Sequence, residues 1–159
     1  MRTETITSAQ NSKIKMLLAL GEKSRTRREN SLFVVEGRKE IGHCLDAGYK
    51  VRTLFACPEI IPERELEKIA ERCGEDCTIV NVPAHLYEKI AYRGSTEGVI
   101  AEAEIIDKSL GDIKLRENPL VIVLESVEKP GNLGAVLRTA DAADADAVIV
   151  CDPLTDLYN

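Results

Sequence analysis

The stretch Glu125–Val150, ESVEKPGNLGAVLRTADAADADAVIV, gathers the side chains whose types and spacing suggest chemistry. Its Pro130-Gly131 pair would turn a loop past the carboxyl end of the preceding apolar run, where open α/β sheets place their ligands. Asn132 falls at the expected start of a helix, where its side chain can cap backbone N–H groups. Gly134 leaves room beside Arg138, whose planar fork can hold a phosphate through two hydrogen bonds. We therefore predict a phosphate site here.

The residues alone leave three other interpretations of this stretch open. The run Gly131–Gly134 has the G-x-x-G spacing of a KH-type RNA-binding loop, although it follows a buried parallel strand and so has the wrong topology. It also matches half of a dinucleotide fingerprint, which requires the longer G-x-G-x-x-G. The third interpretation is an ordinary strand-to-helix turn with a surface arginine.

The first 30 residues carry an excess of positive charge. Seven basic and three acidic side chains give them a net charge of +4, in a chain whose net charge is −6. A basic arm on an acidic body favours local contact with phosphates over a general attraction to nucleic acid. The alternative is a solvated helix end. If the basic arm contacts phosphates, the densest basic run should bind RNA. This run comprises Lys23, Arg25, Arg27 and Arg28.

The overall composition predicts a soluble, cytoplasmic protein without a metal site. Apolar residues make up 44% of the 159 residues and aromatic residues only 4%, so the core must be aliphatic. No apolar run approaches the roughly 20 residues of a membrane span, and the first residues do not form a signal peptide. The five scattered cysteines fit a reducing compartment. Cys73 and Cys77 have a spacing that zinc could use, but no second Cys/His pair follows, so we expect two half-buried thiols that flank a turn.

Apolar periodicity predicts a first domain over residues 1–106, in which strands alternate with helices. A first helix would be capped at Thr7-Ser8, carry an apolar stripe and end at Gly21, with the basic run after it. The stripe comprises Ile14, Leu17 and Leu18. Further helices are predicted over residues 37–48, 63–73 and 83–90, and strands over residues 32–36, 51–57, 78–82 and 99–106. This alternation is typical of a parallel-type α/β sandwich.

A polar linker, residues 107–118, separates the first domain from a second unit at residues 119–159. The apolar runs 120–124 and 147–151 read as parallel strands that are buried on both faces. The helix between them, residues 132–143, would pack on the strands through a stripe of Leu133, Val136, Leu137 and Ala140. Two strands and one helix cannot cover both faces of a sheet. We therefore expect this unit to be the opening of a larger domain.

The helix segment also carries a resemblance. Residues 130–140, PGNLGAVLRTA, resemble the first motif of the SpoU/TrmH methyltransferases, which is roughly P-G-N-x-G-x-x-x-R-T-A. Upstream, Phe33–Gly37 and Gly94–Ala101 look like the substrate-binding domain of the same family, an α/β/α sandwich akin to small ribosomal RNA-binding proteins. The matches occur in the order and at the spacing of the family, and together they cover nearly the whole chain.

The resemblance implies a function and its cofactor. The family transfers a methyl group from S-adenosylmethionine to a ribose 2′-hydroxyl of ribosomal or transfer RNA, through a trefoil-knotted domain that acts as a homodimer. The motif match makes Arg138 the catalytic and RNA-contacting arginine, and Asn132 the asparagine of motif one. A guanidinium beside the hydroxyl and its 3′ phosphate can favour the alkoxide and align it, whereas a neutral arginine base is disfavoured by a pKa above about 12.

Two departures from the family pattern accompany the resemblance. Asp144 stands where the family usually has glycine, and we expect a left-handed backbone there at a small local cost. The second and third motifs, which form the knot and the S-adenosylmethionine pocket, are absent from these 159 residues, so we expect no cofactor-binding residues in the chain and a catalytically incomplete fragment. A non-catalytic RNA-binding module is the alternative function. An unrelated nucleotide-binding α/β protein would need a phosphate loop that the sequence does not show.

Overall fold

The structure, a computed structural model, describes residues 2–92 and 97–158. The chain divides into two compact units, residues 1–106 and residues 107–159. Unit 1 contains β1 (Arg2–Thr5), α1 (Ser12–Glu22), α2 (Ser24–Asn30), β2 (Leu32–Glu36), α3 (Arg38–Asp46), β3 (Val51–Ala56), α4 (Glu63–Cys73), β4 (Thr78–Asn81), α5 (Ala84–Ile90) and β5 (Val99–Glu104). Unit 2 contains the short 3-10 helix η2 (Leu110–Asp112), β6 (Val121–Glu125), α6 (Pro130–Ala142) and β7 (Ala147–Cys151).

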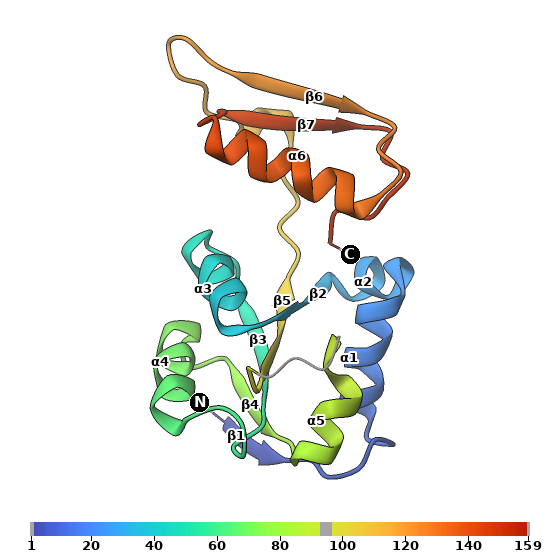
Figure 1. The fold of residues 1–159 in the computed structure, drawn as a ribbon, viewed down its shortest axis with the longest axis vertical. Coiled ribbons are helices and arrows are strands. Elements are labelled where there is room, and N and C mark those ends of the chain that lie inside the picture. The colour runs from blue at the N-terminus through green and yellow to red at the C-terminus, as the bar shows by residue number, and fades with distance from the viewer. Residues whose placement is uncertain (1, 93–96, 159) are drawn as a thin grey trace. The chain divides into compact units, whose positions relative to one another are not determined.

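Unit 1 is the predicted α/β/α sandwich. Its strands form one sheet in the order β1-β4-β3-β5-β2, with α3 and α4 on one face and α1 and α5 on the other (Figure 1). Each face has an aliphatic core. The core under α3 and α4 includes Ile41, Leu54 and Ala70, and the core under α1 and α5 includes Ile14, Phe55 and Tyr87. The predicted α/β class is therefore confirmed.

The sheet is mixed, so the prediction of a parallel-type sandwich was wrong for one strand. β1, β4 and β3 run parallel, but β5 runs antiparallel to both of its neighbours, β3 and β2. Apolar periodicity locates strands but does not give their directions, so the sequence pattern did not indicate that β5 returns in the opposite direction.

The N-terminal region differs from its predicted boundaries. Residues 2–5 form β1, an edge strand that was not predicted, and α1 starts later than expected. The N-cap of α1 is Asn11, whose side chain accepts a hydrogen bond of 2.9 Å from the Lys13 N–H, instead of Thr7-Ser8. Leu20 replaces Leu18 in the buried stripe, since Leu18 is 36% exposed. The basic run is itself helical and forms most of α2.

The two upstream segments that resemble the family lie side by side in the sheet. Glu36 pairs with Ile100 in the β2–β5 ladder, and the Gly37 N–H donates to the Val99 carbonyl at 3.3 Å. Gly98 has a φ of +74°, and a Cβ there would lie 2.6 Å from the Ile61 backbone nitrogen, so the position requires glycine. Residues 94–96 of the second segment lie outside the described residues.

Unit 2 is a β-α-β unit. β6 and β7 pair in parallel register from Val121 with Ala147 to Glu125 with Cys151, and α6 lies between them in the chain (Figure 1). Leu133 and Ala140 of α6 are 3% exposed. Leu137, which was predicted in the same stripe, is 42% exposed and lies outside the contact. No helix among the described residues is long and apolar enough to cross a membrane.

Candidate functional site

The candidate site is the loop between β6 and α6, at the carboxyl ends of the two strands of unit 2. Ser126 has a left-handed φ of +53°, and its N–H donates to the Cys151 carbonyl at 3.0 Å. The Leu154 N–H donates to the Val127 carbonyl at 3.1 Å. The loops that follow β6 and β7 are therefore tied to each other, at the edge where open α/β sheets bind ligands.

This loop borders a hollow of about 390 Å³, called here the loop hollow. Its lining comprises Ser126, Val127, Glu128, Lys129, Asn132 and Val136. Four of these six residues carry polar side chains, so the loop hollow can take a polar ligand. Ser126, Glu128 and Lys129 were not predicted as site residues, because the family motif starts at Pro130 and the loop before it has no periodic pattern.

Asn132 lines the loop hollow, but it does not cap α6 as predicted. The helix begins at Pro130, and its N-cap is Lys129, whose side chain makes no capping hydrogen bond. The Asn132 N–H donates to the Lys129 carbonyl at 3.0 Å, which places Asn132 inside the first turn. The helix starts earlier than predicted because proline is favoured at the first helical position, where its missing N–H leaves no intrahelical hydrogen bond unmade. The Asn132 side chain is exposed.

Arg138 lies on a different face of α6 from Asn132. Six residues separate the two, which corresponds to a rotation of about 120° around the helix, and Arg138 is not among the residues that line the loop hollow. Its Nη1 lies 3.5 Å from the place where a Cβ on Gly134 would be, so the side chain folds back over that glycine. Within residues 2–92 and 97–158, no hydrogen bond or ion pair engages the exposed Arg138 guanidinium. The structure thus brings Arg138 to Gly134, as predicted, and leaves it apart from Asn132.

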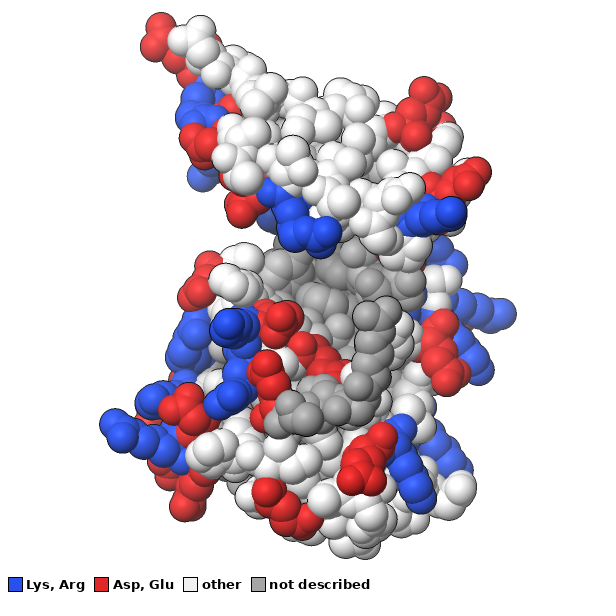
Figure 2. Space-filling model, viewed as in Figure 1, with Lys and Arg blue, Asp and Glu red and all other residues white. Residues whose placement is uncertain are grey.

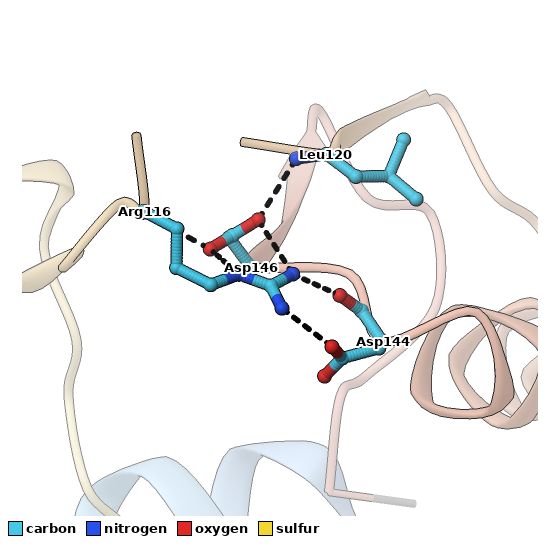
Figure 3. A network of polar contacts seen from close by, with 4 residues as sticks. All are labelled: Arg116, Leu120, Asp144 and Asp146. Carbon is cyan, nitrogen blue, oxygen red and sulfur yellow. Dashed lines mark hydrogen bonds and ion pairs between the residues drawn. The ribbon is translucent and has the colours of Figure 1, made fainter. Parts of the chain in front are cut away.

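A polar network holds the other end of α6 (Figure 3). Arg116 donates two hydrogen bonds to the Asp146 carboxylate, from Nε to Oδ1 at 2.6 Å and from Nη2 to Oδ2 at 3.0 Å. It also donates to the carboxylate and to the backbone carbonyl of Asp144. The Leu120 N–H donates to Asp146 Oδ2 at 2.8 Å. The Asp146 side chain is only 3% exposed. These contacts fix the α6–β7 turn to the segment that leads into β6.

The same network shifts the pKa values of its members. Hydrogen bonds from Arg116, and then from the Leu120 N–H, hold the pKa of Asp146 well below its usual range. The two carboxylates in turn raise the pKa of Arg116, with Asp146 as the larger cause. Asp144 has the expected left-handed backbone, with a φ of +54°. Aspartate tolerates this conformation better than most residues that are not glycine, and its carboxylate forms an ion pair with Arg116.

The predicted RNA-contact residues of unit 1 have different environments. Lys23, Arg25 and Arg28 are exposed, and Arg25 forms a 2.7 Å ion pair with Glu29 one turn along α2. Arg27 is 3% exposed, and its Nη1 donates to the Leu20 carbonyl at 2.6 Å. The prediction of an RNA contact at Arg27 does not fit this burial, because the guanidinium donates a hydrogen bond to a backbone carbonyl near the end of α1. Figure 2 shows basic and acidic side chains interspersed on the visible face of unit 1.

Sequence comparison relates both units to one family. Residues 11–101 match the model of the MRM3-like substrate binding domain, and residues 119–159 match the model of the SpoU rRNA Methylase family. The chain belongs to the SpoU/TrmH family of RNA methyltransferases. The resemblance drawn from the sequence is therefore confirmed, and the two models occur in the order of the two units.

Two curated SpoU/TrmH relatives match over most of the chain. The 23S rRNA (guanosine(2553)-2′-O)-methyltransferase RlmP of Bacillus subtilis (strain 168) is 27% identical over 97% of the chain and 57% of the relative. The 23S rRNA (uridine(2479)-2′-O)-methyltransferase of Streptomyces viridochromogenes is 30% identical over 88% of the chain and 48% of the relative. The chain thus spans about half the length of the curated relatives it matches.

Solved structures of this family have the same fold. An rRNA methyltransferase from Sinorhizobium meliloti is similar with a TM-score of 0.87 and 29% identity, over 99% of this chain and 58% of that one. An AdoMet-bound rRNA methyltransferase from the same organism gives a TM-score of 0.85 at 29% identity, over 98% of this chain and 57% of that one.

Proposed function

We propose that the chain is the RNA-binding and first-motif part of an S-adenosylmethionine-dependent RNA 2′-O-methyltransferase. The observation that carries the proposal is the colinear match of a substrate-binding model to unit 1 and of a SpoU methylase model to unit 2. The relatives that cover most of the chain are named 23S rRNA 2′-O-methyltransferases. Ribosomal RNA is therefore the favoured substrate, with transfer RNA as the second. A cytoplasmic location and a homodimer belong to the same proposal.

In this proposal unit 1 holds the RNA through α2 and unit 2 contributes to the reaction. Lys23, Arg25 and Arg28 are the phosphate contacts, because they are exposed and lie at the N-cap of α2 or within this short helix. Arg27 is left out of the set because it is buried. We place the S-adenosylmethionine pocket in segments of the protein other than these 159 residues. That cofactor supplies the methyl group.

The two motif residues have separate roles in the proposal. Asn132 lines the loop hollow and can orient a ribose or phosphate group there by hydrogen bonds. Arg138 offers a planar fork that the described residues leave available for a phosphate and for a developing alkoxide. Because the two side chains lie on different faces of α6, they contact different groups of the substrate.

Methyl transfer is the test of this function. A protein that contains this sequence together with the cofactor-binding half is expected to transfer tritiated methyl from S-adenosylmethionine to a ribosomal RNA transcript. Arg138→Lys keeps the charge but loses the planar fork, so activity should fall at least about tenfold while the free energy of unfolding stays within about 0.5 kcal/mol of wild type. Wild-type rates for Arg138→Lys would remove this residue from the mechanism. RNA binding without any methyl transfer would favour the non-catalytic RNA-binding module.

A further inference from the structure

A second hollow lies in unit 1, where α2 ends, β2 begins and β5 ends. It has a volume of about 270 Å³ and is called here the α2 hollow. Asn30 is the last residue of α2, and the Ile105 N–H donates to the Ser31 carbonyl at 2.9 Å, so the end of this helix is tied to the residue after β5. The full lining comprises Asn30, Ser31, Leu32, Arg52, Glu104 and Ile105. The α2 hollow thus adjoins the helix that carries the proposed RNA contacts.

The apolar and planar groups of the α2 hollow suit the face of a nucleobase. Leu32 and Ile105 are half-buried apolar side chains. Arg52 donates through Nε to Glu104 Oε1, and its Nη2 forms an ion pair with the same oxygen. These two contacts to one carboxylate fix the plane of the guanidinium. Because unpaired RNA bases stack on guanidinium planes, Arg52 offers a fixed stacking surface beside the two apolar side chains.

Two oxygen atoms of the α2 hollow can accept hydrogen bonds from a ligand. In the described part of the chain, no hydrogen bond or ion pair uses Glu104 Oε2, and a carboxylate only accepts. Asn30 Nδ2 donates to the Thr26 carbonyl at 2.8 Å, which leaves Oδ1 as the acceptor of this amide. Guanine carries two adjacent donor groups, N1–H and N2–H, on its Watson–Crick edge, whereas each of the other RNA bases carries one donor group there. The acceptors of the α2 hollow therefore favour guanine.

Exposed cations adjoin the α2 hollow through two of its lining residues. The Ser31 N–H donates to the Arg28 carbonyl at 3.4 Å, and the Glu104 N–H donates to the Lys50 carbonyl at 2.8 Å. The side chains of Arg28 and Lys50 are both exposed. The lining itself contains one acid, Glu104, which is paired with Arg52, so its formal charge is zero and does not oppose the approach of a phosphate.

We propose that the α2 hollow binds one unpaired guanine base of the RNA, with the adjoining phosphates at Arg28 and Lys50. This inference rests on the proposed function, which assigns phosphate contacts to α2. It adds a contact that distinguishes bases, because phosphate contacts position RNA without reading its sequence. The Glu104 and Asn30 oxygens accept from the base edge, and Arg52 stacks on its face.

The test compares two fluorescently labelled, single-stranded oligoribonucleotides in anisotropy titrations of the folded 159-residue chain. One is a short run of uridines, and the other has guanosine at its central position. The guanosine oligonucleotide should bind at least about fivefold more tightly, which is the lower end of the discrimination that a well-matched base contact gives. Inosine at the same position lacks the N2 amino group and should lose most of this preference.

Two acid variants separate recognition of the base from a change in charge. Glu104→Gln should abolish the preference for guanosine, because an amide is a weaker acceptor than a carboxylate and no longer holds Arg52 by an ion pair. Glu29→Gln makes the same charge change on α2, where Glu29 pairs with Arg25 at 2.7 Å outside the lining of the α2 hollow. This control should raise the affinity for both oligonucleotides equally and keep the preference.

The same titrations distinguish failure of this inference from failure of the proposed function. Equal affinity of the wild-type chain for the two oligonucleotides, or a preference that survives Glu104→Gln, would overturn the guanine site. If the salt dependence of binding still falls in Arg25→Ala/Arg28→Ala, α2 binds RNA phosphates without reading a base, and the proposed function stands. If the wild-type chain binds neither oligonucleotide, the guanine site and the RNA-binding role of unit 1 both fail.

Discussion

Arg27 and Arg28 are neighbours in the sequence and have opposite environments in α2. The Arg27 guanidinium is buried and donates to the Leu20 carbonyl at the end of α1, whereas Arg28 is exposed. Helix ends leave carbonyl groups without intrahelical partners, and a buried donor that satisfies them stabilises the junction between two helices. A run of basic residues therefore mixes one structural arginine with surface cations, and the sequence pattern does not separate them.

The first residue-scale prediction compares these two arginines. Arg27→Ala leaves buried carbonyls without a donor, so it should lower the free energy of unfolding of unit 1 by about 1–3 kcal/mol. Arg28→Ala should change it by less than about 0.5 kcal/mol, because the side chain is exposed. Urea unfolding followed by circular dichroism measures both. Equal midpoints for the two variants would contradict the structural role of Arg27.

At the scale of elements, unit 2 depends on the segment before its first strand. The predicted linker 107–118 contains η2 and Arg116, and Arg116 binds both aspartates of the α6–β7 turn (Figure 3). The Asp146 carboxylate also accepts from the Leu120 N–H, next to the start of β6. A single buried carboxylate thus joins the entry to β6, the end of α6 and the start of β7. Its ionisation should matter for the whole unit.

The pH dependence of unit 2 follows from the lowered pKa of Asp146. Because its pKa is lower in the folded than in the unfolded protein, the network stabilises unit 2 fully above the unfolded value of about 3.9. That contribution is lost as the pH falls through the lower pKa of the folded state. Urea titrations at pH 7, 4 and 3, followed by backbone NMR signals of β6 and β7, should show a falling midpoint.

Two variants test whether Asp146 causes this effect. Asp146→Asn should destabilise unit 2 at pH 7 and flatten the dependence on pH. Asp141→Asn makes an equal charge change at an exposed position of α6 and is the control. A pH profile that is the same in wild type and Asp146→Asn would show that other carboxyl groups cause the acid sensitivity.

Particular elements show what the sequence could and could not predict. The helices and inner strands of unit 1 were predictable because apolar periodicity marks buried faces. β1 was missed because Arg2–Thr5 contains no apolar residue, and its pairing with β4 uses backbone groups that any sequence offers. α2 was missed because its side chains are polar, and the contact that anchors it to α1 comes from the buried Arg27.

The candidate site was predictable only for residues that lie close together in the sequence, within the family motif. The neighbourhood of Gly134 and Arg138 follows from helical spacing, because residues four apart lie on one face. The capping role of Asn132 was wrong because Pro130 starts the helix earlier. Arg116 and Asp146 are 30 residues apart in the sequence, and no pattern in either segment indicates their contact.

At the scale of the whole molecule, RNA binding should depend on a few local charges rather than on net charge, which is −6. The double variant Arg25→Ala/Arg28→Ala should weaken binding of a ribosomal RNA fragment and flatten its salt dependence. The log–log slope should fall by about 0.7 to 0.9 for each lost phosphate contact. Filter binding at several salt concentrations measures this slope.

Arg64→Ala is the control for RNA binding. It removes one positive charge, where the double variant removes two, from an exposed position on α4, on the opposite face of the sheet from α1. Its slope should equal that of the wild type. If the double variant also keeps the wild-type slope, α2 is not the RNA-binding element.

The 159-residue chain should also separate RNA binding from cofactor binding. We expect it to bind RNA through unit 1 and to show no stoichiometric binding of S-adenosylmethionine in calorimetry. Micromolar, one-to-one binding of the cofactor would show that residues of this chain form the pocket. The loop hollow would then be the first place to examine, since it is lined by the loop that follows β6, at the edge where open α/β sheets bind ligands.

The place of β5 in the sheet has a consequence for synthesis on the ribosome. β5 is the last strand of unit 1 to be made, yet it lies between β3 and β2 and pairs with both. While the chain grows, β1, β3 and β4 can assemble, but β2 has no partner strand until residues 99–104 emerge. Pairings between strands that are distant in the sequence form slowly, and an unpaired strand edge invites association with other chains. Until Glu104 has left the ribosome, the edges of β3 and β2 that β5 later covers are unpaired in the nascent protein. During that interval a nascent-chain chaperone could protect these two edges from association with other chains.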